Sequence, residues 1–402
     1  MVQTDVLVIG GGATGAGIAR DLARRGIDTL LVERGDVASG TTGRSHALLH
    51  SGGRYAENDP DGVAECIEEN RILRDIAPHC IQDTGGLFLQ TAADDPEYLS
   101  QKHTACEDIG IPVEPVDGEQ VQQSLPVADD IQRAFHVPDA VIDPFRLTVA
   151  NLVDAIDHGA QVEPRTAVTD LHGDGGEVSG ATIRHDADET RISADHVVNA
   201  AGAWAGSVAA MADVSIGMQP TAGVMAVVEN PGIDTVLNRC RPPDDGDIIV
   251  PHGDVAVPGT TSTAVDDPDS FSRPGAAVQQ VIDEAADMVP ALQDAAVLDT
   301  YWGVRPLYRP STEGNEGRDI SRGFHLLDHA ERDGVDRFTT IVGGKLTTYR
   351  AMAEAVADHV AATLGVASPT TTHDEPLPGD DDPSTLSPYL DRFGPRPPAS
   401  FQ

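Results

Sequence analysis

The sequence predicts an α/β fold in which a Rossmann-like domain is interleaved with a second domain built on a mixed sheet. Two patterns of strand, glycine turn and helix predict the first domain, one at the N-terminus and one over residues 338–364. Between them, residues 216–335 carry short apolar runs separated by Pro and Gly, which predict a mixed or antiparallel sheet. At 402 residues the chain is long for one hydrophobic core, so two closely packed domains are expected.

The N-terminal pattern has the parts of a nucleotide-binding β-α-β unit. Residues 5–9 form a predicted buried strand, which runs directly into the G-x-G-x-x-G sequence of residues 10–15. Apolar residues then recur at helical spacing up to residue 25, and a second predicted strand over residues 29–32 ends at Glu33. The order and spacing of these parts predict a dinucleotide site.

The residue types in this unit have physical reasons. Gly10 allows a tight turn, Gly12 lets the backbone approach a pyrophosphate at the helix N-terminus, and Gly15 lets helix and strand pack closely. Glu33 is placed to accept hydrogen bonds from ribose hydroxyls and would repel a ribose phosphate, so FAD or NAD is favoured over NADP. Arg34 beside it is a cofactor-binding candidate, although an arginine at this position is more typical of a surface charge.

FAD is favoured over NAD by residues 38–45, whose small polar side chains suit the pyrophosphate and ribityl oxygens. No other glycine cluster lies between a strand and a helix in the same way, so no separate nicotinamide site is expected. The cofactor-binding candidates are Gly10, Gly12, Ala13, Thr14, Gly15, Glu33, Arg34, Thr41, Thr42, Ser45, Gly202, Gly344, Lys345, Leu346 and Thr347.

The domain boundaries follow from these patterns. One FAD-dependent oxidoreductase unit is expected over residues 1–365. Its FAD-binding parts are expected at about 1–85, 140–215 and 335–365, and its substrate-domain parts at about 86–139 and 216–334. Residues 366–402 are rich in Pro and Asp and are expected to form a poorly ordered tail or linker.

The charge balance restricts the partners. Lys and Arg total 27 against 65 Asp and Glu, which gives a net charge of −38. This field repels nucleic-acid phosphates and anionic lipid heads, so neither is an expected partner. Only two of the basic residues are lysines, Lys102 and Lys345, and the acids are spread along the chain. We interpret this composition as that of a protein from a salt-loving organism, with an ordinary acidic enzyme as the alternative.

Location and metal content are judged from absent patterns. No apolar run approaches the roughly 18–20 residues that span a bilayer, and the N-terminus lacks a basic leader, so a cytoplasmic protein without membrane insertion is expected. The four cysteines form no C-x-x-C pair and no cluster has metal-ligand spacing, so buried free thiols and no metal site are expected.

Basic residues indicate an anionic substrate. Lys345 is predicted in the first turn of a helix, where the macrodipole disfavours a cation, so an anion is expected beside it. Arg54 and Tyr55 follow a glycine pair, and Arg305 lies in a mostly apolar segment. With Arg322 as a third arm, these guanidinium groups suit a phosphate or a carboxylate. Each arginine taken alone is more typical of a structural ion pair, and Lys102 is assigned no role in the site.

Oxidation of an alcohol also needs a base for the hydroxyl proton. His50 is the nearest candidate to the predicted flavin loop, His46 is also close, and His252 lies in the predicted mixed sheet. Each is equally typical of a packed histidine. The catalytic candidates are therefore Lys345, Arg305 and His50.

The chain resembles the FAD-dependent glycerol-3-phosphate dehydrogenases, in particular the large A-type component of the anaerobic, quinone-linked enzymes. The resemblance covers residues 3 to about 378, and its most specific segments are residues 40–55, 141–147, 303–307, 326–334 and 343–350. It implies a D-amino-acid-oxidase-like flavoprotein fold, of the glutathione-reductase type, and oxidation of sn-glycerol 3-phosphate to dihydroxyacetone phosphate. It also implies B and C partner subunits that link to the quinone pool, through which the chain would be peripheral to the membrane. The substrate-pocket positions that it implies are Arg54, Tyr55, Arg305, Arg322 and Lys345.

Two departures from the family pattern stand out. The large components of this type continue into a cysteine-containing domain that resembles an iron–sulfur module, whereas this sequence ends in the Pro/Asp-rich stretch. A histidine that aerobic relatives carry near the start of the substrate sheet has no counterpart around residues 221–225, which leaves the identity of the base open.

Two other functions fit the same residues. An FAD-dependent amino-acid or 2-hydroxy-acid oxidase or dehydrogenase would use the arginines for a carboxylate. A flavin module that only relays electrons would need neither the arginines nor Lys345.

Overall fold

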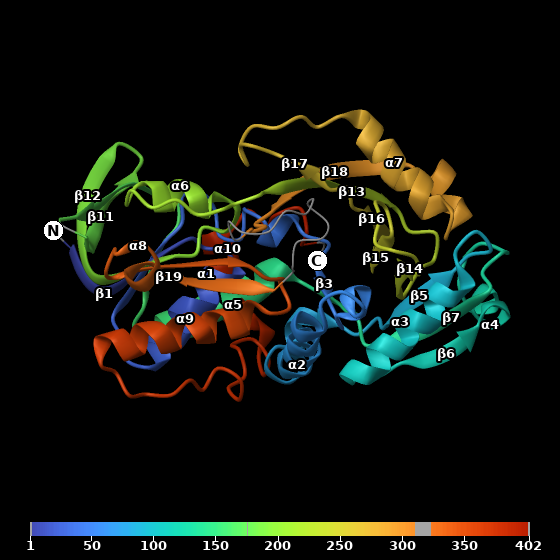
Figure 1. The fold of residues 1–402 in the computed structure, drawn as a ribbon, viewed down its shortest axis with the longest axis horizontal. Helices are drawn as coiled ribbons and strands as arrows, with labels where there is room; N and C mark the ends of the chain where they lie inside the picture. Colours follow the sequence, from blue (N-terminus) through green and yellow to red (C-terminus); the bar gives the residue numbers. More distant parts are fainter. Residues whose placement is uncertain (1, 175, 310–322, 401–402) are drawn as a thin grey trace.

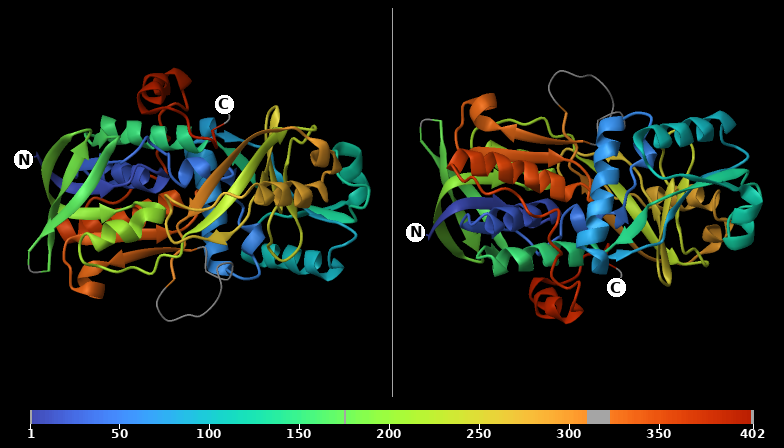
Figure 2. Two further views of the ribbon diagram at one scale, coloured as in Figure 1. Left: turned by 90° about the horizontal axis from the view of Figure 1, so that it is seen from above. Right: turned by 90° about the horizontal axis from the view of Figure 1, so that it is seen from below.

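Two large sheets lie side by side along the length of the molecule. The computed structural model describes residues 2–174, 176–309 and 323–400. In Figure 1 the first sheet and its helices occupy the left half and the second sheet the right half, and both views of Figure 2 show the same division. The prediction of an α/β fold with an interleaved mixed-sheet part is confirmed, since the chain passes from the first sheet to the second and back twice.

The first sheet has eight strands and contains the predicted Rossmann-like unit. Its order is β10-β11-β12-β1-β2-β9, with β20 paired to β12 and β19 paired to β20. The pairs β12/β1, β1/β2, β2/β9 and β12/β20 are parallel. The strands are β1 (Val2–Ile9), β2 (Thr29–Val32), β9 (Gln161–Glu163), β10 (Thr166–Gly173), β11 (Val178–His185), β12 (Asp188–Asn199), β19 (Phe324–Asp328) and β20 (Phe338–Gly343).

Three helices cover one face of this sheet and form the largest apolar core with it. They are α1 (Ala13–Arg24), α5 (Pro144–Asp157) and α9 (Tyr349–Leu364). Helix α1 packs against both of the others, and its side chains Ile18 and Leu22 are fully buried. The other face carries the short helix α6 (Ala205–Ala210). The parallel strands are therefore apolar on both faces, as expected for a sheet covered on two sides.

The second sheet has nine strands in mixed orientation. Its order is β17-β13-β16-β15-β14-β5-β7-β6, with β18 paired to β13. Helix α7 (Gly275–Ala286) packs on it, and α3 (Pro96–Ile109) and α4 (Gly118–Ser124) lie beside β5 and β7. The strands are β5 (Gly86–Gln90), β6 (Glu114–Asp117), β7 (Arg133–Val137), β13 (Thr221–Glu229), β14 (Val236–Arg239), β15 (Ile248–His252), β16 (Val255–Gly259), β17 (Thr263–Ala264) and β18 (Val297–Arg305).

A small third sheet and one helix join the two halves. The sheet pairs β8 (Ala140–Ile142) with β3 (Leu48–Leu49) and β4 (Ile81–Gln82). Helix α2 (Pro60–Ile76) stands between the large sheets in the views of Figures 1 and 2. The short helix α8 (His329–Asp333) follows β19. No helix in the described residues is long and apolar enough to cross a membrane.

The prediction of a poorly ordered tail is wrong for residues 366–400. This segment contains helix α10 (Ser387–Phe393), and Leu377, Leu386 and Phe393 are buried in the core of the first half. The buried Arg20 of α1 donates hydrogen bonds to the carbonyl oxygens of Thr372 and Glu375. The few apolar residues of the segment are therefore spaced to dock on the helical face, so the Pro and Asp content did not indicate disorder here.

Two boundaries also differ from the prediction. Strand β19 pairs with β20 in the first sheet, although the sequence placed residues 324–328 in the substrate domain. Helix α9 begins at Tyr349 rather than at Lys345, because residues 345–348 form a turn in which the Thr348 amide donates to the Lys345 carbonyl. Lys345 therefore precedes the helix instead of lying in its first turn.

Candidate functional site

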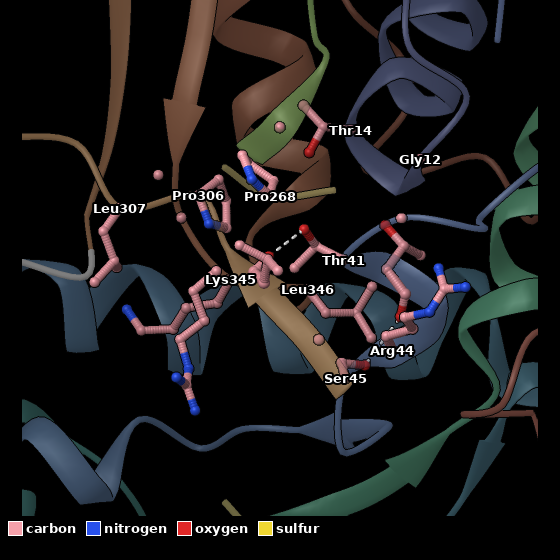
Figure 3. A pocket seen from close by; sticks show the side chains of 18 of the residues that line it. Gly12, Thr14, Thr41, Arg44, Ser45, Pro268, Pro306, Leu307, Lys345 and Leu346 are labelled. Atoms are coloured by element: carbon pink, nitrogen blue, oxygen red, sulfur yellow. Dashed lines mark hydrogen bonds between the residues drawn. The ribbon is translucent and has the colours of Figure 1, made fainter. Parts of the chain in front are cut away.

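A cavity of about 1300 Å³ lies where the two large sheets meet. Its wall combines the ends of β1 and β2 in the first sheet with β13, β16 and β18 of the second. Figure 3 shows Lys345, Leu346 and Thr41 turned toward this cavity, with Gly12 and Thr14 near its upper end. The volume exceeds the roughly 300–1,000 Å³ of an ordinary small-molecule site, so the cavity has room for a dinucleotide and a small substrate.

The glycine motif forms the close turn that the sequence predicts. Gly10 has a φ of 118°, in the left-handed region that favours glycine, and a Cβ there would meet the carbonyl oxygen of Ala200. A Cβ on Gly15 would collide with the carbonyl oxygen of Gly10. Gly12 caps α1 without a side-chain hydrogen bond and lines the cavity, so a diphosphate can approach the helix N-terminus. The turn thus fits the diphosphate of FAD.

Glu33 stands at the end of β2 and is fixed by two backbone groups. Its Oε2 accepts from the Gly11 amide at 2.7 Å, and its Oε1 accepts from the Gly35 amide at 2.7 Å. Each carboxylate oxygen keeps further acceptor capacity toward the cavity, which suits ribose hydroxyls. Its neighbour Arg34 also lines the cavity and pairs with Asp269 at 2.6 Å, so this arginine has a carboxylate partner.

The remaining cofactor candidates divide into two groups. Those that line the cavity are Ala13, Thr14, Thr41, Thr42, Ser45, Gly202, Gly344, Lys345 and Leu346. Gly15 and Thr347 do not line it. Gly15 packs α1 against the turn, as its proposed packing role requires. Thr347 is fully buried, and its Oγ1 accepts from the His50 amide at 3.0 Å, so it supports the wall from behind.

The basic candidates come together at one end of the cavity. Lys345, Arg305, Arg54 and Tyr55 all line it, and the Nζ of Lys345 lies 5.7 Å from the centre of the Tyr55 ring. The Arg305 guanidinium donates to the carbonyl oxygen of Thr261 at 3.0 Å. It also donates to the hydroxyls of Thr221 and Thr260. These acceptors orient the guanidinium. Arg322 lies outside the described residues.

Arg54 has a buried acid beside it. Its Nη2 lies 2.8 Å from Oδ2 of Asp247, whose side chain is fully buried. Arg241 pairs with the other oxygen of the same carboxylate at 2.8 Å. Asp247 therefore holds two arginines near the cavity, an arrangement that links positions 54, 241 and 247 and that no local sequence pattern indicates.

Two histidines of the β3 segment face the same end of the cavity. His50 and His46 both line it. Burial, with the positive charge of Arg305 as a second cause, lowers the pKa of His46 to about 3, so its imidazole is neutral at physiological pH. Within the described part of the chain, Nε2 of His46 has no hydrogen-bond partner. The same low pKa makes His46 a weak proton acceptor, since a general base works best with a pKa near the working pH. His252 is not a lining residue.

Lys102 has a structural position that the sequence did not predict. Its ammonium group is buried and lies 2.7 Å from Oε2 of Glu57. It also donates to the carbonyl oxygens of Gly53 and Arg54 at 3.2 Å. Lys102 thereby holds the short 3₁₀ helix at Gly53–Tyr55, which carries two of the basic-end residues. The scarcity of lysine was the only sequence signal for this role.

Among the described residues, no group of three or more His, Cys, Asp or Glu side chains could hold a metal ion.

Comparisons with known proteins agree with this geometry. Residues 5–350 match the model of the family described as FAD dependent oxidoreductase. The A1 component of the anaerobic glycerol-3-phosphate dehydrogenase of Haloferax volcanii is 50% identical over 406 residues, which cover 98% of this chain and 69% of that protein. The A component of the anaerobic enzyme of Escherichia coli is 45% identical over 390 residues, which cover 96% of this chain and 72% of that protein.

The solved structures agree as well. The glycerol-3-phosphate dehydrogenase of Bacillus halodurans, complexed with FAD, superposes with a TM-score of 0.74 at 28% identity, over 97% of this chain and 71% of that one. The predicted flavoprotein fold and the FAD requirement are therefore confirmed. The chain belongs to the FAD-dependent oxidoreductase family.

Proposed function

We propose that this protein oxidises sn-glycerol 3-phosphate to dihydroxyacetone phosphate, with FAD as the immediate acceptor. The observation that carries the proposal is the basic end of the cavity, where Lys345 and Arg305 face a space that adjoins the glycine turn. A second support is that two relatives at 45–50% identity are named as components of anaerobic glycerol-3-phosphate dehydrogenases.

The basic end fits a phosphate dianion. Threonine oxygens accept from the Arg305 guanidinium and orient it in the cavity wall. Guanidinium groups bind phosphate oxygens through paired, charge-assisted hydrogen bonds. Lys345 would add a point charge, and Tyr55 and Arg54 would close the same side. The net charge of −38 makes such a local reversal of sign necessary for a dianionic substrate.

Oxidation of the secondary alcohol removes one proton from the hydroxyl group and one hydride from the carbinol carbon. When bound, FAD supplies the acceptor for the hydride. We assign the proton to His50, which lines the basic end of the cavity, rather than to His46, whose low pKa makes it a weak proton acceptor. Lys345 and Arg305 would hold the substrate and stabilise negative charge that develops on its oxygens.

The electrons then have to leave the flavin. We infer that they pass through B and C partner subunits to the quinone pool, because the similar proteins are named as parts of a multi-subunit anaerobic enzyme. Such partners would place this chain at the cytoplasmic face of the membrane.

Anaerobic mixing of the FAD-loaded protein with sn-glycerol 3-phosphate in molar salt tests the proposal. The oxidised-flavin absorbance should be lost, and Arg305→Met should raise the substrate KM by about 10- to 100-fold, as expected when a charged hydrogen bond is removed. Arg184→Met is a matched control, because Arg184 is exposed on β11. Bleaching by glycine or a 2-hydroxy acid, with none by glycerol 3-phosphate, would overturn the proposal.

A further inference from the structure

Two arginines of the cavity wall have no part in the proposed reaction. Arg44 ends the short helix at Thr42–Arg44, and Arg273 lies between β17 and α7. Both line the cavity. Within residues 2–174, 176–309 and 323–400, neither forms an ion pair, whereas Arg34 and Arg54 of the same wall pair with Asp269 and Asp247.

The two guanidinium groups act on each other as like charges. Burial lowers the pKa of Arg44, and the positive charge of Arg273 lowers it further. No acidic group contributes in the opposite direction. Two cations held together without a carboxylate are unfavourable unless an anion lies between them, and this is notable in a chain with 65 acidic residues.

Arg44 lies at the end of the cavity that contains the glycine turn. The residue two positions before it, Thr42, accepts a hydrogen bond from the Ala13 amide in the first turn of α1 at 3.1 Å. In Figure 3, Arg44 and Lys345 lie on opposite sides of Thr41, and Gly12 lies above Arg44. Arg44 is therefore separated from the basic end that the proposed substrate would occupy.

Arg273 reaches this region on a segment of the second half of the molecule. Asp269 pairs with Arg34 through two hydrogen bonds of 2.6 and 3.0 Å. The Phe271 ring lies 6.1 Å from the Trp302 ring, and the Arg273 guanidinium lies 4.8 Å from the centre of the Phe271 ring. The Asp269 pair ties this segment to the first half and the Phe271 ring packs it on β18, so Arg273 is held as an exposed residue of the cavity lining.

We propose that Arg44 and Arg273 together bind the diphosphate of FAD, one from each half of the molecule. The diphosphate carries two negative charges and would neutralise the two guanidinium groups. The glycine turn would then supply backbone donors on one side and the arginines would supply charge on the other. The same phosphate chemistry is present in glycerol 3-phosphate, so the experiment must distinguish the two sources.

The rate of FAD release from the holoenzyme tests this assignment without relying on turnover. Release is followed by the fluorescence of free FAD after dilution in molar salt. Arg44→Met should release FAD about 10- to 100-fold faster, and the exposed Arg273→Gln about two- to fivefold faster. The exposed Arg184→Met should release it at the unaltered rate. With FAD kept saturating, the KM for glycerol 3-phosphate should stay within twofold.

Two results would overturn the assignment. An unchanged FAD release rate together with a raised KM for glycerol 3-phosphate would mean that the arginines bind the substrate phosphate instead of the FAD diphosphate. If neither the FAD release rate nor the KM changes, Arg44 and Arg273 bind neither phosphate group. If Arg44→Met does not fold, the FAD release rate of Arg273→Gln still tests the assignment. The Arg273 side chain is exposed, so its replacement does not open the core. This inference concerns the cofactor of the proposed function. Because FAD release is measured without substrate, it can be interpreted even if the protein does not oxidise glycerol 3-phosphate.

Discussion

The ammonium nitrogen of Lys102 lies 2.7 Å from Oε2 of Glu57, and the Lys102 side chain is only 1% exposed. The same nitrogen donates to the carbonyl oxygens of Gly53 and Arg54. All three donors of the ammonium group are therefore used, and all three acceptors belong to the segment that carries Arg54 and Tyr55 into the cavity. A buried cation with no atom in the cavity wall thus fixes the backbone of two wall residues.

Lys102→Met should destabilise the protein by about 3 kcal/mol. This value is at the low end for breaking a buried ion pair, because the Glu57 side chain keeps 20% exposure. The double variant Lys102→Met with Glu57→Leu should recover most of the loss, since an apolar pair of similar size removes the uncompensated charge. Urea unfolding in molar salt measures both. If the single and double variants lose the same free energy of unfolding, the unpaired Glu57 charge is not the cause of the destabilisation.

Phe393→Ala in the C-terminal helix should cost about 3–5 kcal/mol, as for other fully buried aromatic side chains. Phe393 is 0% exposed in the largest apolar core. Asp391→Ala is the control, because Asp391 is exposed on the same helix and should change stability by less than about 0.5 kcal/mol. A comparable small effect of both changes in urea unfolding would mean that the segment does not contribute to the core.

The tail illustrates which parts of the fold could be predicted from the sequence. The β-α-β unit could be predicted because its determinants are local: an apolar strand, a glycine turn and a helical repeat adjoin one another. The docking of residues 366–400 depends instead on Arg20, more than 350 positions away, whose guanidinium meets the carbonyl oxygen of Thr372. The Pro and Asp content of the segment does not reveal a contact with a residue so distant in the sequence.

The same distinction holds for the site. Lys345 and Arg305 could be predicted as site residues from the sequence. A lysine beside a helix start and an arginine in a mostly apolar segment each require an anionic partner. The pairing of Arg54 with Asp247 spans 193 positions, and that of Lys102 with Glu57 depends on α3 packing against a turn. No local pattern singles out Arg44, because it lies between small polar residues that themselves suit the cofactor.

The free energy of unfolding should fall as the pH is lowered from 6.5 to 4, in part because of His196. Burial lowers the pKa of His196 to about 4, and its Nε2 lies 2.9 Å from Oγ1 of Thr339. Its unfolded pKa is about 6.5, so the unfolded chain binds the proton first and is stabilised as the pH falls through this window. The limiting slope is about 1.4 kcal/mol per pH unit.

A variant isolates this contribution. Between pH 6 and 5, wild-type protein should lose about 1 kcal/mol more than His196→Gln. His185→Gln, at an exposed position, should follow the wild type. Burial raises the pKa of Glu65 to about 7, so Glu65 acts with the opposite sign, but its effect is common to all three proteins and cancels. Parallel pH profiles for wild type and His196→Gln would contradict the prediction.

The four cysteines should resist alkylation in the native protein. All four are free and buried, which confirms the prediction of buried thiols. Burial raises the pKa of Cys66 to about 11 and those of Cys106 and Cys240 to about 12, so almost no reactive thiolate exists at pH 8. Mass spectrometry after brief iodoacetamide treatment should show no added group in the native protein and four in urea. Rapid labelling of the folded chain would show that a thiol is accessible.

Lowering the salt concentration should weaken binding of glycerol 3-phosphate while the fold persists. The net charge of −38 repels a dianion at long range, whereas the basic end attracts it only over a few ångströms. Molar salt shortens the Debye length to about 3 Å and removes the repulsion, but at 0.1 M the length is about 10 Å and the repulsion reaches the cavity mouth. The KM should therefore rise several-fold over this range while the far-UV circular dichroism stays constant. Unchanged or tighter binding at low salt would mean that the local arginines and Lys345, rather than the global charge, control the approach of the substrate.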